Sequence, residues 1–180
     1  YSLRHNGKSF RAPNLHRYIK DLPLSNPKAL KGLQDINFGE ILDVLEELGK
    51  NLDFDKNPYI RQAYKASLVA APYPPAMLKN SYFMLPMAFN RDSIEEIAEK
   101  RIGIDYLDGW VSQELLDGRT LNVRAFGART LHIPAGNGGL VSAITLIRNA
   151  ITRSDAIIKA PSNDPMTAMA LARTLAEIAP

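Results

Sequence analysis

The chain has 180 residues, of which 46% are hydrophobic and 23% are charged, and its formal net charge at pH 7 is +3. This composition is typical of a globular protein with one sizeable core, and because Lys and Arg are interspersed with acidic residues we do not expect nucleic-acid binding. Cysteine is absent, which excludes disulfides and a cysteine nucleophile within these residues. The sequence lacks a signal-peptide pattern and the run of about 18 apolar residues that a membrane span needs, so we expect a cytoplasmic protein.

Residues 1–36 are rich in Pro, Asn, Lys and Arg and show little periodicity. This composition predicts an N-terminal arm, irregular or built of short strands, that lies over a neighbouring surface.

Residues 37–105 have the spacing of helices. Apolar side chains recur every three or four positions in FGEILDVLEELGKNL, which predicts a helix that stops at Gly49. A second helix is predicted from Pro58, and a third is interrupted by Pro86. A fourth is predicted over DSIEEIAEKRIG, with Asp92 as its cap. We expect this helical region to pack on residues 128–180.

The remaining residues change to extended patterns. Asp117-Gly118 between two runs that can be extended predicts a β-hairpin within residues 106–127. Residues 128–180 then read as strand RTLHIPA, helix LVSAITLIRNAIT, strand DAIIKA and helix MTAMALARTLAEIA. Strands that alternate with helices predict an α/β fold with part of a parallel, nucleotide-binding sheet.

A glycine-rich turn, AGNGG, follows the first of these strands. Its Asn137 has two interpretations. The side chain can satisfy backbone groups or adopt the left-handed conformation, as Asn often does in turns. Alternatively, its amide can donate a hydrogen bond to an oxyanion that forms at a carbonyl or thioester. Gly136, Gly138 and Gly139 would let the backbone approach a ligand, although the run is not GxGxxG.

Lys159 leaves the second strand, at the edge where open α/β sheets bind ligands. Its ammonium could donate to ribose hydroxyls or to a phosphate, and a solvated lysine is the alternative. Ser162 and Asn163 follow, and Asp164 and Thr167 have the character of a helix start, which capping explains as readily as a ligand does.

The histidines and aromatic residues give weaker signals. His5, His16 and His132 lack the spacing of metal ligands, and we expect His132 to be a hydrogen-bonded residue of the core or of a pocket wall. Several aromatic residues at helical spacing are expected in the core or an interface, with an acyl-binding channel as the alternative: Tyr59, Tyr64, Tyr73, Tyr82 and Phe83.

A series of motifs occupies residues 104–180: Gly109-Trp110, the turn Asp117-Gly118, and the runs HIPAGN, ITLIRNAIT and IIKAPSNDPMTAMALA. In this order and spacing they resemble the bacterial luminescence-type (LuxC-like) fatty acyl-CoA reductases, a branch of the aldehyde dehydrogenase superfamily. The resemblance implies an aldehyde-dehydrogenase-like, Rossmann-type sheet, with residues 128–180 as its first βαβα part.

The resemblance also implies an activity. Such an enzyme takes a fatty acyl group from acyl-CoA or another activated donor, in some cases an acyl-transfer partner protein, onto a cysteine, and reduces it with NADPH to the aldehyde. It implies that Asn137 holds the oxyanion and that the cofactor is bound by Ile133, Ala135, Gly136, Lys159 and Ser162. Relatives that prefer NAD commonly have Glu at the position of Ser162, so the resemblance with this hydroxyl predicts NADP(H).

Two further expectations follow from the resemblance. The hairpin over residues 111–126 resembles strands that pair with another subunit, so we expect a homo-oligomer. The family usually has Val-Pro or Phe-Pro where this chain has Gly138-Gly139, which predicts a looser turn.

The catalytic cysteine and catalytic domain would lie beyond Pro180, so we expect an N-terminal portion that is inactive alone. The alternatives are a non-enzymatic module that binds a nucleotide or a partner subunit, and a dehydrogenase of small aldehydes.

Overall fold

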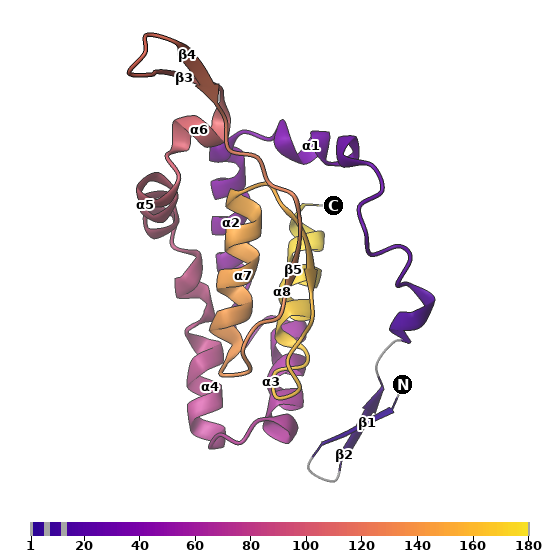
Figure 1. Ribbon diagram of the computed structural model, residues 1–180. Coiled ribbons are helices and arrows are strands. Elements are labelled where there is room, and N and C mark those ends of the chain that lie inside the picture. The colour runs from indigo at the N-terminus through magenta and orange to yellow at the C-terminus, as the bar shows by residue number, and fades with distance from the viewer. Residues whose placement is uncertain (1, 6–7, 12–13, 180) are drawn as a thin grey trace.

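The N-terminal arm contains only short elements (Figure 1). The computed structural model describes residues 2–5, 8–11 and 14–179. Strands β1 (Ser2–His5) and β2 (Lys8–Arg11) form an antiparallel pair. They are followed by the 3-10 helices η1 (Leu15–Arg17) and η2 (Pro27–Leu30) and by α1 (Lys31–Gln34).

The first long helix, α2 (Phe38–Lys50), forms because its apolar residues share one face and Asn37 caps its start. The Asn37 side chain accepts a hydrogen bond of 2.8 Å from the Gly39 amide. The helix ends at Lys50, one residue after the predicted stop, so Gly49 lies in its last turn. A Cβ at Gly49 would lie 2.7 Å from the Cβ of Phe89, so this glycine permits close packing of two segments.

The next helices follow the predicted order. Asn57 caps α3 (Pro58–Ala70). The predicted interruption near Pro86 is confirmed, since α4 (Pro75–Phe83) gives way to the 3-10 helix η3 (Leu85–Phe89). The cap of α5 (Arg91–Arg101) is Asn90, which accepts from the Ser93 amide at 2.9 Å, so the assignment of Asp92 was wrong. The sequence did not predict α6 (Ile104–Asp108), which is too short to show helical periodicity.

The third part contains a hairpin and a parallel strand pair, as predicted. Strands β3 (Val111–Glu114) and β4 (Thr120–Val123) are antiparallel, and their hairpin projects from the rest of the chain (Figure 1). Strands β5 (Arg129–His132) and β6 (Asp155–Ile158) are parallel. Helices α7 (Gly139–Ile151) and α8 (Thr167–Ile178) follow these two strands. The chain therefore has a mixed α/β fold.

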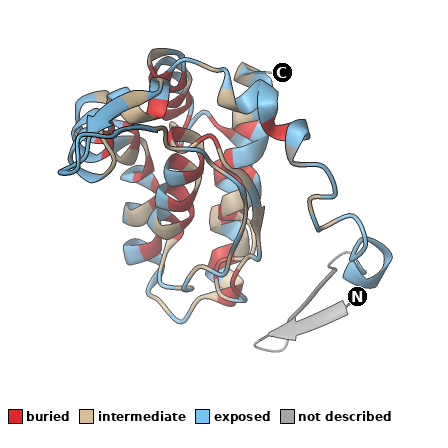
Figure 2. Cartoon of the chain, turned by 45° about the horizontal axis from the view of Figure 1, so that its top comes forward, coloured by how far each residue is buried: buried red, intermediate tan, exposed pale blue. Residues whose placement is uncertain are grey.

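One apolar core joins the helical region to the two last helices. Leu45, Leu48, Ile60, Ala143 and Leu171 are all buried in it. Buried residues lie on the facing sides of the helices, whereas the hairpin is largely exposed (Figure 2). No helix in the described part of the chain has the length and apolar character to cross a membrane. This core fixes the helices that carry the loops of the candidate site.

Candidate functional site

The candidate residues lie at the carboxyl ends of β5 and β6. Because these strands are parallel and in register, with His132 opposite Ile158, the turns that follow them lie at the same edge. The Lys159 amide donates to the His132 carbonyl at 2.9 Å, so the pairing continues one residue past β6. The side chains of Lys159 and Ile133 are exposed, the latter to 71%. The fold therefore places the two predicted parts of the cofactor site next to one another.

The turn after β5 presents Asn137 to solvent. The residue is exposed, and its side chain makes no hydrogen bond within the described residues. It does not have a positive φ; the positive φ of this turn, 142°, belongs to Gly138. Neither ordinary role of a turn Asn applies here. The amide donors of Asn137 are therefore available to a ligand.

The structure explains why glycine occupies the two positions after Asn137. Gly138 has a φ that residues with side chains rarely adopt. Gly139 begins α7, where a Cβ would lie 3.1 Å from Cγ2 of the buried Thr167. The start of α7 thus packs closely on the start of α8. The Gly138-Gly139 pair allows both the turn and this contact.

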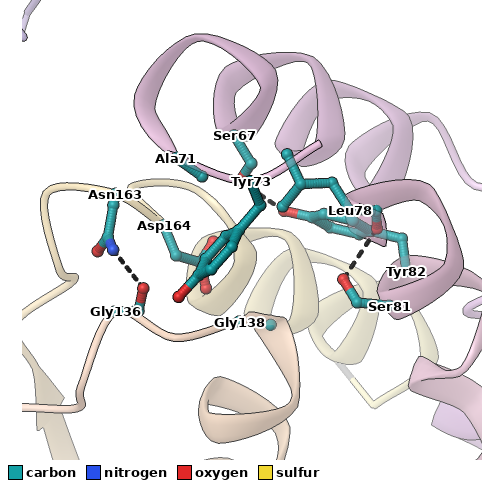
Figure 3. A pocket seen from close by; sticks show the side chains of 11 residues that line it. Ser67, Ala71, Tyr73, Leu78, Ser81, Tyr82, Gly136, Gly138, Asn163 and Asp164 are labelled. Carbon is teal, nitrogen blue, oxygen red and sulfur yellow. Dashed lines mark hydrogen bonds between the residues drawn. The ribbon is translucent and has the colours of Figure 1, made fainter. Parts of the chain in front are cut away.

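The turn after β6 contacts the turn after β5 directly. The half-buried Asn163 donates a hydrogen bond from Nδ2 to the Gly136 carbonyl (Figure 3). Its neighbour Ser162 is exposed. The contact links a residue beside Asn137 to a residue beside Ser162, although the partners are 27 positions apart in the sequence. We did not predict this contact, and the polar run after Lys159 was its only sequence signal.

A buried cluster of hydroxyl groups lies behind the two turns. The Thr167 hydroxyl donates to Asp164, and Tyr82 bonds to Thr167 at 2.8 Å and to Ser67 at 2.9 Å. An ionised Asp164 can only accept hydrogen bonds, and each hydroxyl has a single proton to donate. Thr167 therefore donates to Asp164, Tyr82 donates to Thr167, and Ser67 donates to Tyr82. Ser142 also donates to Asp164, at 3.5 Å. The predicted helix start is confirmed at Thr167, the first residue of α8, whereas Met166 occupies the N-cap position without a capping side-chain bond.

Burial raises the pKa values of two groups in this cluster, Asp164 and Tyr82. Removal of Asp164 from water raises the pKa of its carboxyl, although the hydrogen bond from Thr167 acts in the opposite direction. Burial, and then the nearby Asp164 charge, raise the pKa of Tyr82 to about 12. The phenol of Tyr82 therefore stays neutral and serves as a hydrogen-bonding group of the core.

Of the five aromatic residues, Tyr82 is buried in the core, Tyr59, Tyr64 and Tyr73 are half-buried, and Phe83 is exposed. Tyr64 packs edge-on against Tyr82, with ring centroids 5.7 Å apart, and against Phe54 at 5.2 Å. Tyr73, from the loop between α3 and α4, and Tyr82 line a cavity of about 10 Å³ beside the glycine turn (Figure 3). Such a cavity holds one water molecule at most. The interpretation as core aromatics is confirmed for Tyr64 and Tyr82.

His132 lies on the wall of a separate, open concavity of about 680 Å³ between α5, β5 and α7. Its ring accepts or donates in hydrogen bonds to Thr130 at 3.0 Å and to the buried Asn149. The expectation of a hydrogen-bonded residue in a pocket wall is confirmed. Within the part of the chain that the structure describes, no group of three or more acidic or histidine side chains could hold a metal ion.

Comparison with known proteins decides the family. The family model of acyl-CoA reductases named LuxC matches residues 33–180. The chain belongs to this LuxC family. Long-chain acyl-protein thioester reductases are similar to it: that of Vibrio harveyi is 29% identical over 152 residues, and that of Photobacterium phosphoreum is 27% identical over 173 residues. These matches cover 82% and 91% of this chain but 31% and 34% of the relatives. The chain spans about a third of the length of these curated relatives.

The second turn of this LuxC-family chain fits an anionic ligand. Its exposed side chains include the Lys159 ammonium and the Ser162 hydroxyl, and residues 159–163 contain no carboxylate. The nearest acid in sequence, Asp164, is only 4% exposed and is bonded to the hydroxyl groups behind the turn. A phosphate group at Lys159 would therefore meet a cation and a neutral donor in a turn whose own residues 159–163 carry no carboxylate. The residues fit a cofactor that carries a ribose phosphate.

Proposed function

We propose that this chain is part of a reductase that converts fatty acyl thioesters to fatty aldehydes with NADPH. One observation carries the proposal: in a LuxC-family chain, the exposed Asn137, whose side chain has no hydrogen bond to another described residue, lies in a turn that contacts the turn of Lys159 and Ser162. Below, "the reductase" means the polypeptide that contains these residues together with a catalytic cysteine.

The first step that we propose is acyl transfer to that cysteine, which this chain does not contain. The thiolate attacks the carbonyl carbon of the thioester and forms a new C–S bond, and the carbonyl electron pair moves onto oxygen. Asn137 donates an amide N–H to this oxyanion. The intermediate then collapses, the original C–S bond breaks, and the donor sulfur leaves as a thiolate. Asn137 thus lowers the energy of the charge that develops in this step.

We assign the cofactor site to the exposed residues at the ends of both strands. Lys159 would donate to the adenosine ribose and its phosphate, and the neutral Ser162 hydroxyl would donate to that phosphate without charge repulsion. Ile133, Ala135 and Gly136 would form the adjoining surface of the first turn. When bound, NADPH supplies the hydride that the reduction requires. The chain's own contribution is to select and position this cofactor.

The substrate and assembly are part of the same proposal. The curated relatives are named as acyl-protein thioester reductases, so we propose an acyl group delivered as a thioester of CoA or of an acyl-transfer protein. We propose that the exposed hairpin β3–β4 pairs with another subunit. We also propose four functional parts, namely the arm (1–36), the helical region (37–105), the hairpin (106–127) and the first part of the nucleotide-binding domain (128–180).

The test is a product assay on the reductase. Long-chain acyl-CoA and NADPH should yield fatty aldehyde in proportion to the NADPH consumed, and NADH should support a lower rate. Aldehyde is measured by gas chromatography and NADPH by its absorbance. Binding of NADPH without aldehyde from either acyl-CoA or acyl-protein would instead indicate a binding module. Turnover of short aldehydes alone would indicate an ordinary dehydrogenase.

A further inference from the structure

Asn163 stands out among the residues that the proposed mechanism does not use. It lies between the exposed Ser162 and the buried Asp164, and its side chain reaches across to the backbone of the other turn. Nδ2 donates to the carbonyl of Gly136, the residue directly before Asn137 (Figure 3). This side chain therefore connects the cofactor turn to the turn that carries the proposed oxyanion donor.

The turn that contains Asn163 is held in place by hydrogen bonds to the residues around it. The Asp164 amide donates to the Pro161 carbonyl at 3.3 Å, and the Asp164 carboxylate accepts from Thr167 at the start of α8. Thr167 is completely buried and is bonded in turn to Tyr82. Asn163 consequently projects from a backbone that is fixed to the core on one side.

The turn that contains Asn137 has fewer side-chain contacts that hold its backbone in place. It is flanked by two glycines, and an ideal Cβ at Gly138 would have no atom within 4 Å. The Asn137 side chain has no hydrogen bond to another described residue. The amide of Asn163 is the side-chain donor that holds the backbone just before Asn137. Asn137 can stabilise an oxyanion only if its amide is correctly placed, so loss of the bond from Asn163 should lower the rate of acylation.

The two turns also fit one another sterically. A Cβ at Gly136 would overlap the side-chain atoms of Asn163. Gly136 does not have a positive φ, so its backbone conformation is open to alanine. The glycine is therefore needed for the space that Asn163 occupies and not for its conformation.

We propose that Asn163 is a positioning residue, whose hydrogen bond to the Gly136 carbonyl holds Asn137 in the geometry that stabilises the oxyanion. This inference rests on the proposed function. Loss of the bond leaves Asn137 present but displaced. A misplacement of about 1 Å at a catalytic group lowers a rate by about 100-fold, and a partial displacement by less.

The first test is a double-mutant cycle in the reductase. The rate is that of thiol release from long-chain acyl-CoA in the first turnover without NADPH. Asn163→Ala should lower it at least about 10-fold, and so should the isosteric Asn163→Asp, which loses the donor. In the Asn137→Ala background, Asn163→Ala should have no further effect, because Asn163 acts through Asn137.

The outcomes separate the inference from the function on which it rests. Asn137→Ala without effect on acylation would refute the oxyanion role and, with it, the positioning role. A slow Asn137→Ala variant beside an unaffected Asn163→Ala variant would overturn the positioning role alone. Equal losses from Asn163→Ala in both backgrounds would also overturn it, since they would show a merely structural residue.

A second cycle tests the contact without reference to catalysis. Gly136→Ala should lower the thermal unfolding midpoint, because its Cβ displaces Asn163. In the Asn163→Gly background the same change should lower the midpoint much less, since the space is then empty. Equal decreases in both backgrounds would contradict the packing of Asn163 on Gly136. Gly32→Ala is the matched control, because a Cβ there would have no atom within 4 Å.

Discussion

The two turns after β5 and β6 have an exposed side, here called the front, and a side that packs on the core, here called the back. The polar groups of these two sides differ in whether they have hydrogen-bond partners within the chain. On the front, Asn137, Lys159 and Ser162 are exposed, and their side chains make no hydrogen bonds among the described residues. On the back, Tyr82 and Asp164 are buried and bonded to other hydroxyl groups of the chain. Buried polar groups require partners for stability, whereas exposed ones can be kept for a ligand. Changes on the front should therefore affect activity, and changes on the back should affect stability.

The largest expected effect is on the front, at Asn137. Asn137→Ala removes the proposed oxyanion donor and should lower the first-turnover acylation rate by about 100- to 1000-fold. The thermal unfolding midpoint of the same preparation should not change, because the side chain makes no hydrogen bond to the residues that the structure describes. A lower midpoint with a normal rate would reverse the proposed division between front and back.

The largest effect on the back is expected at Tyr82. Tyr82→Phe leaves the buried Ser67 without this partner and should lower the free energy of unfolding by about 1–3 kcal/mol. The acylation rate should change little, because Thr167 still donates to Asp164. Tyr59→Phe is the matched control, since it removes an exposed hydrogen bond to Glu177. Equal losses in the two variants, measured by denaturant unfolding, would contradict the importance of burial.

The next effect concerns cofactor choice at Ser162. Ser162→Glu places a carboxylate beside Lys159, where it would repel a ribose phosphate and accept from a ribose hydroxyl. The ratio of kcat/KM for NADPH to that for NADH should fall by about 10-fold or more. Ser162→Ala, which adds no charge, should change this ratio much less. An unaltered ratio in Ser162→Glu would count against the assignment of the cofactor turn.

The smallest effect is a pH dependence of stability at Asp164. Because burial raises the pKa of this carboxyl, the folded state holds its proton more tightly than the unfolded state does. The contribution of Asp164 to the stability of the folded state is therefore present at low pH, and it is lost as the pH rises through the raised pKa of the folded state. Relative to that of Asp164→Asn, the unfolding midpoint of the unmodified protein should decrease as the pH rises above about 4, the ordinary pKa of an aspartate.

The exposed Asp117 provides the control for this measurement. Hydrogen bonds from Arg119 lower the pKa of Asp117, so its small contribution has the opposite sign and is lost as the pH falls. A midpoint difference for Asp164→Asn that does not depend on pH would show that the carboxyl is not perturbed.

Local sequence patterns predicted the elements well, because helical periodicity and turn dipeptides act over a few residues. The helix from Phe38, the hairpin at Asp117-Gly118 and the parallel pair β5–β6 were all predicted correctly. The role of Gly49 was not, because its reason is contact with Phe89, which is 40 positions away in sequence. Long-range packing of this kind leaves no periodic signal.

The same limit applies to the candidate site. Residue type and position after a strand identified Asn137 and Lys159 as candidates, and the structure placed their turns at one edge. The bond from Asn163 to Gly136 depends on how the starts of α7 and α8 pack together, and the hydroxyl series from Ser67 to Asp164 depends on the packing of α3, α4 and α8. Such contacts follow from tertiary structure and could not be derived from the order of residues alone.

Hydrogen exchange of the reductase with and without NADPH tests the central claim most directly. We predict that NADPH slows amide exchange in residues 133–137 and 159–163, the two turns on the front, while the hairpin residues 111–123 exchange at an unchanged rate. This measurement depends on neither a variant nor turnover. Protection elsewhere in the reductase, with unchanged exchange in both turns, would contradict the assignment of the cofactor site to the ends of β5 and β6.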